Sequence, residues 1–326
     1  MLGYLVRRLL WVVVLLVAIS ILTFLLFFLL PGDPAGQALG RGATPQTVAQ
    51  VRHRMGLDLP VWKQYRNFLH GPDLGTGHAT GILRWPPNLG YSFRNNEPVL
   101  PTILDRVPVT ASVALGGCVL WLLLGFATGI LAALRPRSLY DRAAMGLALF
   151  GVSAPVFITG LGLLYIFYFK LGWAPAPGYV PLSRDPLAWA THLVLAWVTV
   201  STIYVALYTR MLRAGMLEVA GEDYIRTARA KGLSERRVVL AHLVRSSVTP
   251  AVTQLGLDLG GLLGGVIVVE RVFGLPGLGG ATVQAITDND LPMIQGVVLF
   301  AAFFVIIANL LVDLAYTALD PRVRHG

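Results

Sequence analysis

Long apolar stretches without charge constrain this chain more than any other feature. Five of them contain no Asp, Glu, Lys or Arg, and a sixth contains only Asp258; they span residues 9–30, 107–134, 143–169, 186–209, 291–312 and, with Asp258, 246–269. About 20 apolar residues are enough for a helix to cross the hydrocarbon core of a bilayer. The sequence therefore predicts an all-α polytopic membrane protein with six transmembrane helices.

Composition excludes the other common classes. Charged residues make up 13% of the 326 residues, roughly half of the ~25% found in soluble domains, which excludes a water-soluble enzyme. An apolar content of 55% excludes a disordered chain, and a single cysteine, Cys118, excludes an intrachain disulfide. The first stretch exceeds the about 7–15 apolar residues of a signal peptide, so we expect a retained helix.

Lys and Arg predict the orientation. With the N-terminus in the cytoplasm, the inside tails and loops carry basic residues at higher density than the outside loops, as the positive-inside rule requires. This divides the chain into a cytoplasmic N-terminus with the first helix (1–30), an extracytoplasmic loop region (31–106) and a five-helix core (107–326) with a cytoplasmic loop at 210–245. Both termini are then cytoplasmic. The net charge of +9 reflects inside loops that face anionic lipid, and no nucleic acid is implied.

The cytoplasmic loop carries a helix with both of its end signals. Glu222 and Asp223 stand where a helix dipole favours anions, and Arg229 with Lys231 stand where it favours cations. Gly232 suits the left-handed residue that ends a helix. Ser234 then caps a second helix, with Glu235 in its first turn.

One face of the short helix combines a large, a small and a basic residue. Helical spacing places Tyr224, Ala228 and Lys231 together. Because Ala228 is small, we expect another surface to approach the backbone there. The alternative interpretation is a solvated basic loop that only orients the chain.

The same loop resembles a known motif. Residues 223–234, Asp-Tyr-Ile-Arg-Thr-Ala-Arg-Ala-Lys-Gly-Leu-Ser, resemble the cytoplasmic motif of ABC-importer permeases, most closely the dipeptide/oligopeptide (and nickel) branch. Five further pieces resemble that family in the same order, at residues 4–9, 30–34, 56–65, 89–92 and 270–279, and the tail at 320–324 does so too. Thr227 and His242-Leu-Val-Arg245 depart from the general motif in the manner of the peptide branch.

The resemblance implies a type I ABC-importer permease fold and a non-catalytic transport subunit in a bacterial inner membrane. It implies that the short helix docks on a separate ATPase subunit, through the motif residues Asp223, Tyr224, Ile225, Arg226, Ala228, Arg229, Lys231 and Gly232. The implied partners are a homologous second permease, two ATP-binding subunits, an extracytoplasmic substrate-binding protein and a di- or oligopeptide substrate. No cofactor is expected on this chain, with ATP and Mg at the ATPase subunits. Nickel or another small solute is the alternative cargo.

The remaining motifs of the sequence indicate turns, helix ends and helices, and they do not indicate a further binding site. Residues 274–280 are glycine-rich but lack the lysine of a phosphate-binding loop, so we expect a turn at the outer mouth of the pathway. The six histidines are scattered, which argues against a metal site. Pro155 and Pro250 are expected to kink or begin helices. The loop pieces 46–55 and 61–70 have helical patterns.

Intramembrane acids are the remaining candidates. Asp258, with Gln254 one turn away on the same face, either lines the pathway or forms a polar bond between helices. An ion-coupled secondary transporter that uses Asp258 is the competing class of function, and a receptor or scaffold without transport is a third. Asp313, with Asn309 one turn before it, is expected to have a structural role.

Overall fold

The computed structural model describes residues 2–29, 35–36, 44–54, 56–71, 81–83, 85, 87–92 and 94–319. The motif-like pieces predicted at residues 30–34 and 320–324 lie outside these ranges, as do the side chain of Asp313 and those of its neighbours from residue 311 onward. Two compact units make up the chain: residues 1–108 with 276–307, and residues 109–275 with 308–326. The division predicted from the sequence, into residues 1–30, 31–106 and 107–326, follows the expected position of the membrane and not the packing of the chain. It therefore stays a prediction.

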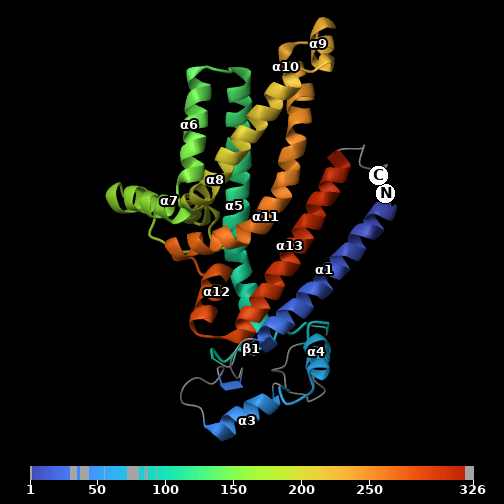
Figure 1. The fold of residues 1–326 in the computed structure, drawn as a ribbon. Helices are drawn as coiled ribbons and strands as arrows, with labels where there is room; N and C mark the ends of the chain where they lie inside the picture. Colours follow the sequence, from blue (N-terminus) through green and yellow to red (C-terminus); the bar gives the residue numbers. More distant parts are fainter. Residues whose placement is uncertain are drawn as a thin grey trace. The chain divides into compact units, whose positions relative to one another are not determined.

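The first unit combines one long N-terminal helix with a small outer region. Its elements are α1 (Leu2–Leu29), α3 (Pro45–Arg54), α4 (Val61–His70), β1 (Tyr91–Ser92), β2 (Glu97–Pro98), the start of α5 (Val99–Leu134), α12 (Leu278–Thr287) and most of α13 (Leu291–Leu319) (Figure 1). The two strands pair antiparallel, with Tyr91 opposite Pro98. The two helices predicted in the outer loop are confirmed as α3 and α4.

Polar contacts hold the outer region to the helices of the first unit. Ser20 of α1 and Tyr65 of α4 share a hydrogen bond of 2.9 Å between their hydroxyl oxygens. The carboxylate of Asp290 accepts the Ser92 hydroxyl and the Met293 amide, the latter at 3.3 Å, so it begins α13 as a cap. Apolar residues of α5, α12 and α13 pack beneath, among them Val99, Ile103 and Val297.

The second unit contains the longest helices and the loop at residues 210–245. Its elements after α5 are α6 (Leu139–Ser153), α7 (Val156–Leu163), the π-helical η1 (Leu164–Lys170), α8 (Pro186–Ala220), α9 (Asp223–Ala230), α10 (Glu235–Val238), the π-helical η2 (Val239–Val244) and α11 (Arg245–Val272) (Figure 1). Asp185 caps α8 by accepting the amides of Leu187 and Ala188 at 2.9 and 3.0 Å.

Close approach joins α5 to α8. A Cβ atom added at Gly116 would overlap the indole of Trp197. That indole N–H donates to the backbone oxygen of Ser112 at 2.9 Å. Glycine at position 116 therefore makes room for the indole of Trp197 against the backbone of α5.

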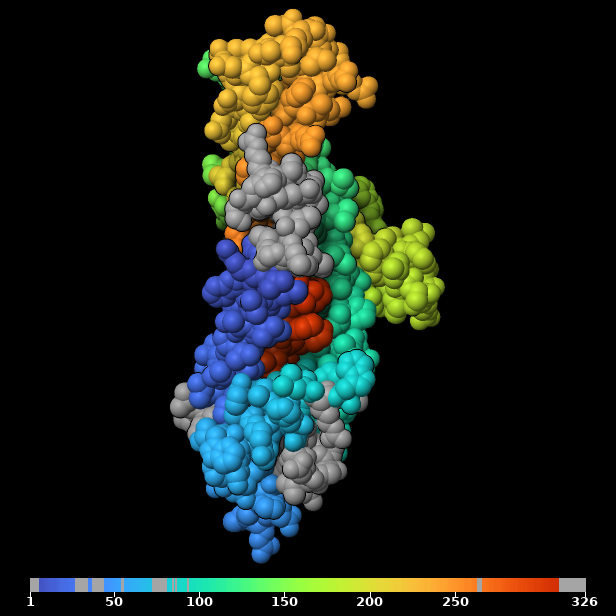
Figure 2. All heavy atoms as spheres, turned by 90° about the vertical axis from the view of Figure 1, so that its right-hand side faces the viewer, coloured from blue at the N-terminus to red at the C-terminus, as the bar shows by residue number. Residues whose placement is uncertain are grey.

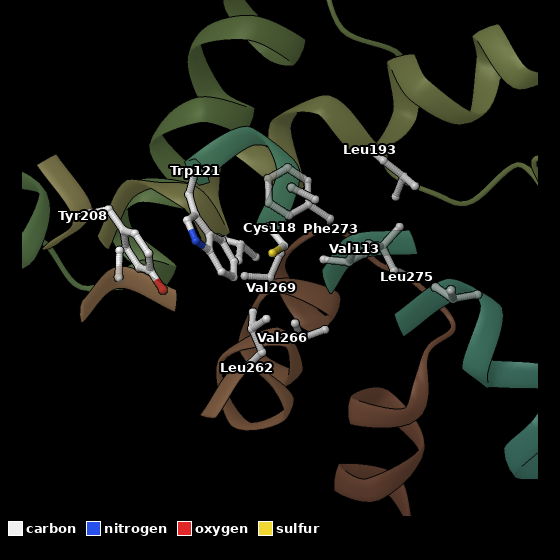
Figure 3. Close-up of a cluster of buried hydrophobic side chains, with 14 residues drawn as sticks. Val113, Cys118, Trp121, Leu193, Tyr208, Leu262, Val266, Val269, Phe273 and Leu275 are labelled. Atoms are coloured by element: carbon white, nitrogen blue, oxygen red, sulfur yellow. The ribbon is translucent and has the colours of Figure 1, made fainter. Parts of the chain in front are cut away.

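A buried group that we call the membrane cluster fills the interior of the second unit. Its members come from α5, α8 and α11 with the residues that follow α11 (Figure 3): Val109, Val113, Cys118, Trp121, Leu193, Ala196, Val200, Tyr208, Ala251, Leu262, Val266, Val269, Phe273 and Leu275. Trp121 and Tyr208 lie beside each other, with ring centroids 6.4 Å apart. The cluster ties the three long helices into one bundle.

The helices account for the predicted membrane spans in two ways. Four single helices are long and apolar enough to cross a bilayer: Val6–Leu26, Val99–Leu134, Pro186–Ala220 and Leu291–Leu310. Two bent pairs, Leu139–Ser153 with Val156–Lys170 and Glu235–Leu262 with Val266–Val272, supply up to two more. Six spans are reached when each bent pair counts as one.

The two prolines and the glycine-rich segment meet the predictions to different degrees. The third stretch bends by 106° between Ser153 and Val156, which confirms the kink expected at Pro155. Proline disfavours helical backbone in the preceding residue, and Ala154 before Pro155 is extended (ψ 123°). The turn expected within residues 274–280 is present at Gly274, which has a φ of +59°, but helix α12 already begins at Leu278. Pro250 lies inside α11, five residues after its start, and does not begin it.

Candidate functional site

The short helix predicted in the cytoplasmic loop is present as α9. It begins at Asp223, directly after Glu222 in the cap position, so both acids lie at its positive end. The Glu222 side chain makes no capping hydrogen bond, and the charge preference is electrostatic. Figure 2 shows residues around α9 and α10, in yellow and orange, as one continuous mass at the end of the second unit.

Helix α9 ends as its sequence predicts. Gly232 has a φ of +76°, the left-handed conformation that glycine adopts without a Cβ penalty. The amide of Gly232 donates to the oxygen of Arg229 at 2.9 Å, and the amide of Leu233 donates to that of Ala228 at 3.4 Å. These two bonds define a Schellman motif, which satisfies the last carbonyl groups and reverses the chain within one residue.

An ion pair braces α9 against α10. Ser234 occupies the predicted cap position, but its side chain makes no capping hydrogen bond. Arg229 instead reaches across the turn, and its Nη2 and Nε donate to the two carboxylate oxygens of Glu235 at 2.7 and 3.2 Å. This two-point bond raises the pKa of the Arg229 guanidinium above its ordinary value. Both side chains are exposed, so the pair fixes geometry more than it adds stability.

The inner face of α9 is apolar and buried. Ile225 is fully buried and Ala228 is 7% exposed. Both belong to a group that we call the loop cluster: Ala133, Leu212, Met216, Ile225, Ala228, Val238, Val239 and Leu243. The surface that approaches the backbone at Ala228, as its small size led us to expect, belongs to this chain itself. Its small side chain lets α9 lie against its own bundle.

The outer face of α9 carries the remaining motif residues. Asp223, Tyr224, Arg226, Arg229, Lys231 and Gly232 are all exposed. The Tyr224 hydroxyl donates to the Ser246 hydroxyl at 3.1 Å, which links this face to the first turn of α11. The structure thus separates the eight predicted residues into two that anchor the helix and six that a partner can reach. Their contact with an ATPase subunit stays a prediction.

The two pathway candidates form a hydrogen-bonded group in the bundle interior. Asp258 is 9% exposed. One carboxylate oxygen accepts the Tyr208 hydroxyl of α8 at 2.9 Å, and the other accepts the Gln254 amide at 2.9 Å. Both oxygens are thereby engaged within the chain. Of the two interpretations left open by the sequence, these contacts support the polar bond between helices, α8 to α11.

Two polar links went unnoticed in the sequence. Arg213 of α8 binds both carboxylate oxygens of Asp141 in α6, with Nη2 donating at 2.8 Å. The fully buried Glu270 accepts the Thr110 hydroxyl at 2.6 Å. The available signal was one of position: Asp141 and Arg213 each stand just beyond a charge-free stretch, but their separation of 72 residues conceals the pairing. Within the described ranges, no three His, Cys, Asp or Glu side chains gather to hold a metal ion.

Comparison with known families matches nearly the whole chain. Residues 1–114 match the family described as "Binding-prot-dependent transport system membrane comp, N-term". Residues 125–325 match "Binding-protein-dependent transport system inner membrane component". Both descriptions name a membrane component of a transport system, in agreement with the long apolar helices of the structure.

Individual relatives align from end to end. A putative peptide transport system permease protein of Brucella abortus (strain 2308) is 39% identical over 325 residues, covering 100% of both chains. A probable peptide ABC transporter permease protein of Sinorhizobium fredii is 38% identical over 99% of both. The dipeptide transport system permease protein DppB of Escherichia coli (strain K12) is 36% identical over 100% of this chain and 99% of its own.

The fold and the loop site together define a polytopic membrane permease, a non-catalytic transport subunit. The chain belongs to the family of binding-protein-dependent transport system inner membrane components, the permeases of ABC importers. Such a permease works in the inner membrane with ATPase and substrate-binding partners.

Proposed function

We propose that this permease imports di- or oligopeptides. One observation carries the proposal: the relatives that align over the whole chain at 36–39% identity are named for peptide or dipeptide transport. Nickel, the alternative cargo, is not favoured by those names. The hydrogen-bonded state of Asp258 gives no support to an ion-coupled secondary transporter.

The proposed assembly places this chain beside a second, homologous permease. Two ATP-binding subunits lie on the cytoplasmic side and hold ATP and Mg, while this chain holds no cofactor. A substrate-binding protein delivers the peptide from the other side. Both termini lie in the cytoplasm, an arrangement that rests on the density of Lys and Arg in the inside loops.

The coupling mechanism follows from the two faces of α9. The exposed outer face, with Tyr224 and Arg226, docks on an ATPase subunit. The buried face passes the movement inward, because Ile225 and Ala228 are packed in the loop cluster. ATP binding can bias the membrane helices only through a link that distinguishes the two states. A short helix with one face locked into the bundle provides that link.

The loop cluster connects α9 to two long helices. Leu212 and Met216 belong to α8, and Leu243 belongs to η2 directly before α11. A displacement of α9 therefore acts on α8 and α11 together. These two helices also share the Tyr208–Asp258 hydrogen bond deeper in the bundle, so we propose that they move as one body.

The first experiment tests coupling and cargo in the intact complex. The transporter is purified with its partners through a tag on this chain and placed in proteoliposomes. We expect ATP-dependent uptake of labelled dipeptide, no competition by Ni²⁺, and ATP hydrolysis that the loaded binding protein stimulates. Nickel uptake without dipeptide uptake would overturn the cargo, and uptake driven by a proton gradient without ATP would overturn the mechanism.

A paired substitution locates the docking surface. Arg226→Glu reverses a charge on the outer face of α9, whereas Arg237→Glu reverses an exposed charge on the neighbouring α10. We expect Arg226→Glu to lower co-purification of the ATPase subunit at least tenfold, with normal amounts of permease in the membrane. Equal losses in the two variants would show a general electrostatic attraction and would contradict docking through α9.

A further inference from the structure

A hollow lies between α5, α6 and α8 of the second unit. Its volume is about 330 Å³. The lining residues follow one face of each helix: Leu120, Leu124 and Thr128 on α5; Ala144, Leu147, Ala148, Phe150 and Gly151 on α6; Val198, Ser201, Thr202, Val205, Ala206 and Thr209 on α8. Leu147 and Phe150 are 72% and 71% exposed, so the hollow is an open groove. We call it the α5–α6–α8 groove.

The walls of this groove offer an occupant no free hydroxyl donor. Thr128 and Thr209 bond to each other through their hydroxyl oxygens at 2.6 Å. Thr202 donates to the Val198 oxygen at 2.9 Å, and Ser201 donates to the Trp197 oxygen at 2.6 Å. Each lining hydroxyl is therefore already engaged with the chain itself. A polar ligand gains little from such walls, whereas an aliphatic chain loses nothing.

The dimensions fit one slim chain. The lining residues of α8 run from Val198 to Thr209, a length of about 16 Å at 1.5 Å per residue. This is about half of a ~30 Å hydrocarbon core, which is the depth of one leaflet. A volume of about 330 Å³ along that length has room for an acyl chain.

One end of the groove carries positive charge. Arg135 directly follows the last residue of α5, seven residues beyond Thr128, and Arg210 directly follows Thr209 on α8. Both arginines are exposed. On the same end, the Asp141–Arg213 pair extends the lining faces of α6 and α8 by one turn. Asp141 is thus neutralised, which leaves Arg135 and Arg210 as an excess of positive charge at the mouth.

We propose that the α5–α6–α8 groove binds one anionic phospholipid of the leaflet at the Arg135 end. One acyl chain fills the groove, and the phosphate lies between Arg135 and Arg210. The apolar length supplies affinity for any lipid of that leaflet. The two arginines select a net negative headgroup, at about 1 kcal/mol for each basic residue near the surface, or roughly fivefold in affinity.

The test titrates the purified intact transporter in detergent with dioleoyl phosphatidylglycerol or dioleoyl phosphatidylcholine, and native mass spectrometry counts bound lipid. We expect one phosphatidylglycerol to bind the wild type roughly 5- to 25-fold more tightly than phosphatidylcholine. Arg135→Gln with Arg210→Gln reduces that preference to twofold or less. Arg142→Gln is the matched control, because Arg142 lies on the face of α6 away from the lining residues.

A second pair of variants tests the apolar part. Ala144→Trp fills the groove and is expected to weaken binding of both lipids at least tenfold. Leu149→Trp adds the same indole on the opposite, exposed side of α6 and leaves binding unchanged. Equal affinity of the two lipids for the wild type, or unaltered binding to Ala144→Trp, would overturn the proposal.

A photo-cross-linker at Leu147 keeps the proposal testable should Ala144→Trp fail to assemble. Leu147 lines the groove and is highly exposed, so the substitution disturbs little packing. In native membranes we expect an adduct with the mass of a phospholipid. An adduct with the partner permease, or with a second copy of this chain, would show that a protein occupies the groove and would overturn lipid binding.

Discussion

The loop cluster and the polar group of Tyr208, Asp258 and Gln254, both in the second unit, are built in opposite ways. Beneath α9, apolar side chains such as Ile225 hold down a helix whose outer face is charged. Within the long helices, the polar group of Tyr208, Asp258 and Gln254 lies inside a bundle whose outward side chains, such as Leu123 and Leu257, are apolar and exposed. Each region places inside what its surroundings lack.

The difference reflects the solvent that each region meets. In water, burying apolar surface stabilises by about 25 cal/mol per Å², so an apolar contact suffices to fix α9. In a bilayer the lipid tails are as apolar as leucine, and helices gain from hydrogen bonds and close packing instead. The same chain therefore uses two kinds of internal contact, and the following predictions test that division in order of expected effect.

The largest effect is expected from removing the anchor of α9. Ile225→Ala leaves a cavity in the loop cluster and should destabilise the docking of α9 by about 2–5 kcal/mol, because Ile225 is fully buried. Hydrogen exchange of amides 223–233 in lipid nanodiscs measures this loss. Leu262→Ala, in the membrane cluster at 3% exposure, is the matched change and should cost less. A larger loss at Leu262 would break the comparison.

A smaller effect is expected at the end of α9. Gly232→Val forces a β-branched residue into φ +76°, at a cost of about 1–2 kcal/mol. A Cβ at this position would have no heavy atom within 4 Å, so any loss arises from the backbone alone. Coupling of ATP hydrolysis to uptake should fall with it. Gly232→Asn is the control, since asparagine tolerates the left-handed region, and it should retain most coupling.

The polar group of the bundle should respond to a loss of polarity rather than of charge. Asp258→Leu removes both hydrogen bonds and leaves the Tyr208 hydroxyl buried without its partner, a loss of about 0.6–1.7 kcal/mol on the scale of helix contacts in membranes. Asp258→Asn retains an oxygen and a matching shape and should cost less than half as much. Thermal unfolding in nanodiscs compares the two. Equal losses would show that the negative charge itself is required.

The smallest effect on stability is expected for a hydrogen-bonded pair of side chains that is exposed to water. Asp58 and His53 form an exposed contact of 2.8 Å, and the hydrogen bond with His53 lowers the pKa of the Asp58 carboxyl below 3.8. Because the pKa of Asp58 is lower in the folded loop than in an unfolded chain, its charged carboxylate stabilises the loop at pH values above the ordinary pKa. That stabilisation is lost as the pH falls through the lowered pKa. Hydrogen exchange of residues 45–70 should increase slightly below pH 4. Asp58→Asn should abolish that step; an unchanged step would assign it to another group.

The sequence predicted best where structure is decided locally. The start of α9, its end at Gly232 and the break at Pro155 all depend on the backbone preferences of a few adjacent residues. Helix α12 was missed because its glycines, Gly279 and Gly280, favour a turn in isolation. Tertiary packing overrides that weak preference, as the burial of Leu278 and Ala281 shows.

The site was predicted in position but not in direction. Helical spacing placed Ala228 with Tyr224 on one face, yet spacing cannot tell which face meets the bundle. Only the partners from α8 and η2, Leu212 and Leu243, decide that Ala228 faces inward. The Asp141–Arg213 pair was hidden for the same reason: its members are far apart in sequence, and no local rule joins them.

The contact between Gly116 and Trp197 has a consequence for how such a chain diverges over time. Because any side chain at position 116 would overlap the indole, a mutation there survives only after a smaller residue has replaced the tryptophan. That replacement in turn removes the bond to Ser112. Relatives should therefore diverge through linked substitutions at positions 116 and 197, whereas position 112 is not tied to them by this bond, because its acceptor is a backbone oxygen.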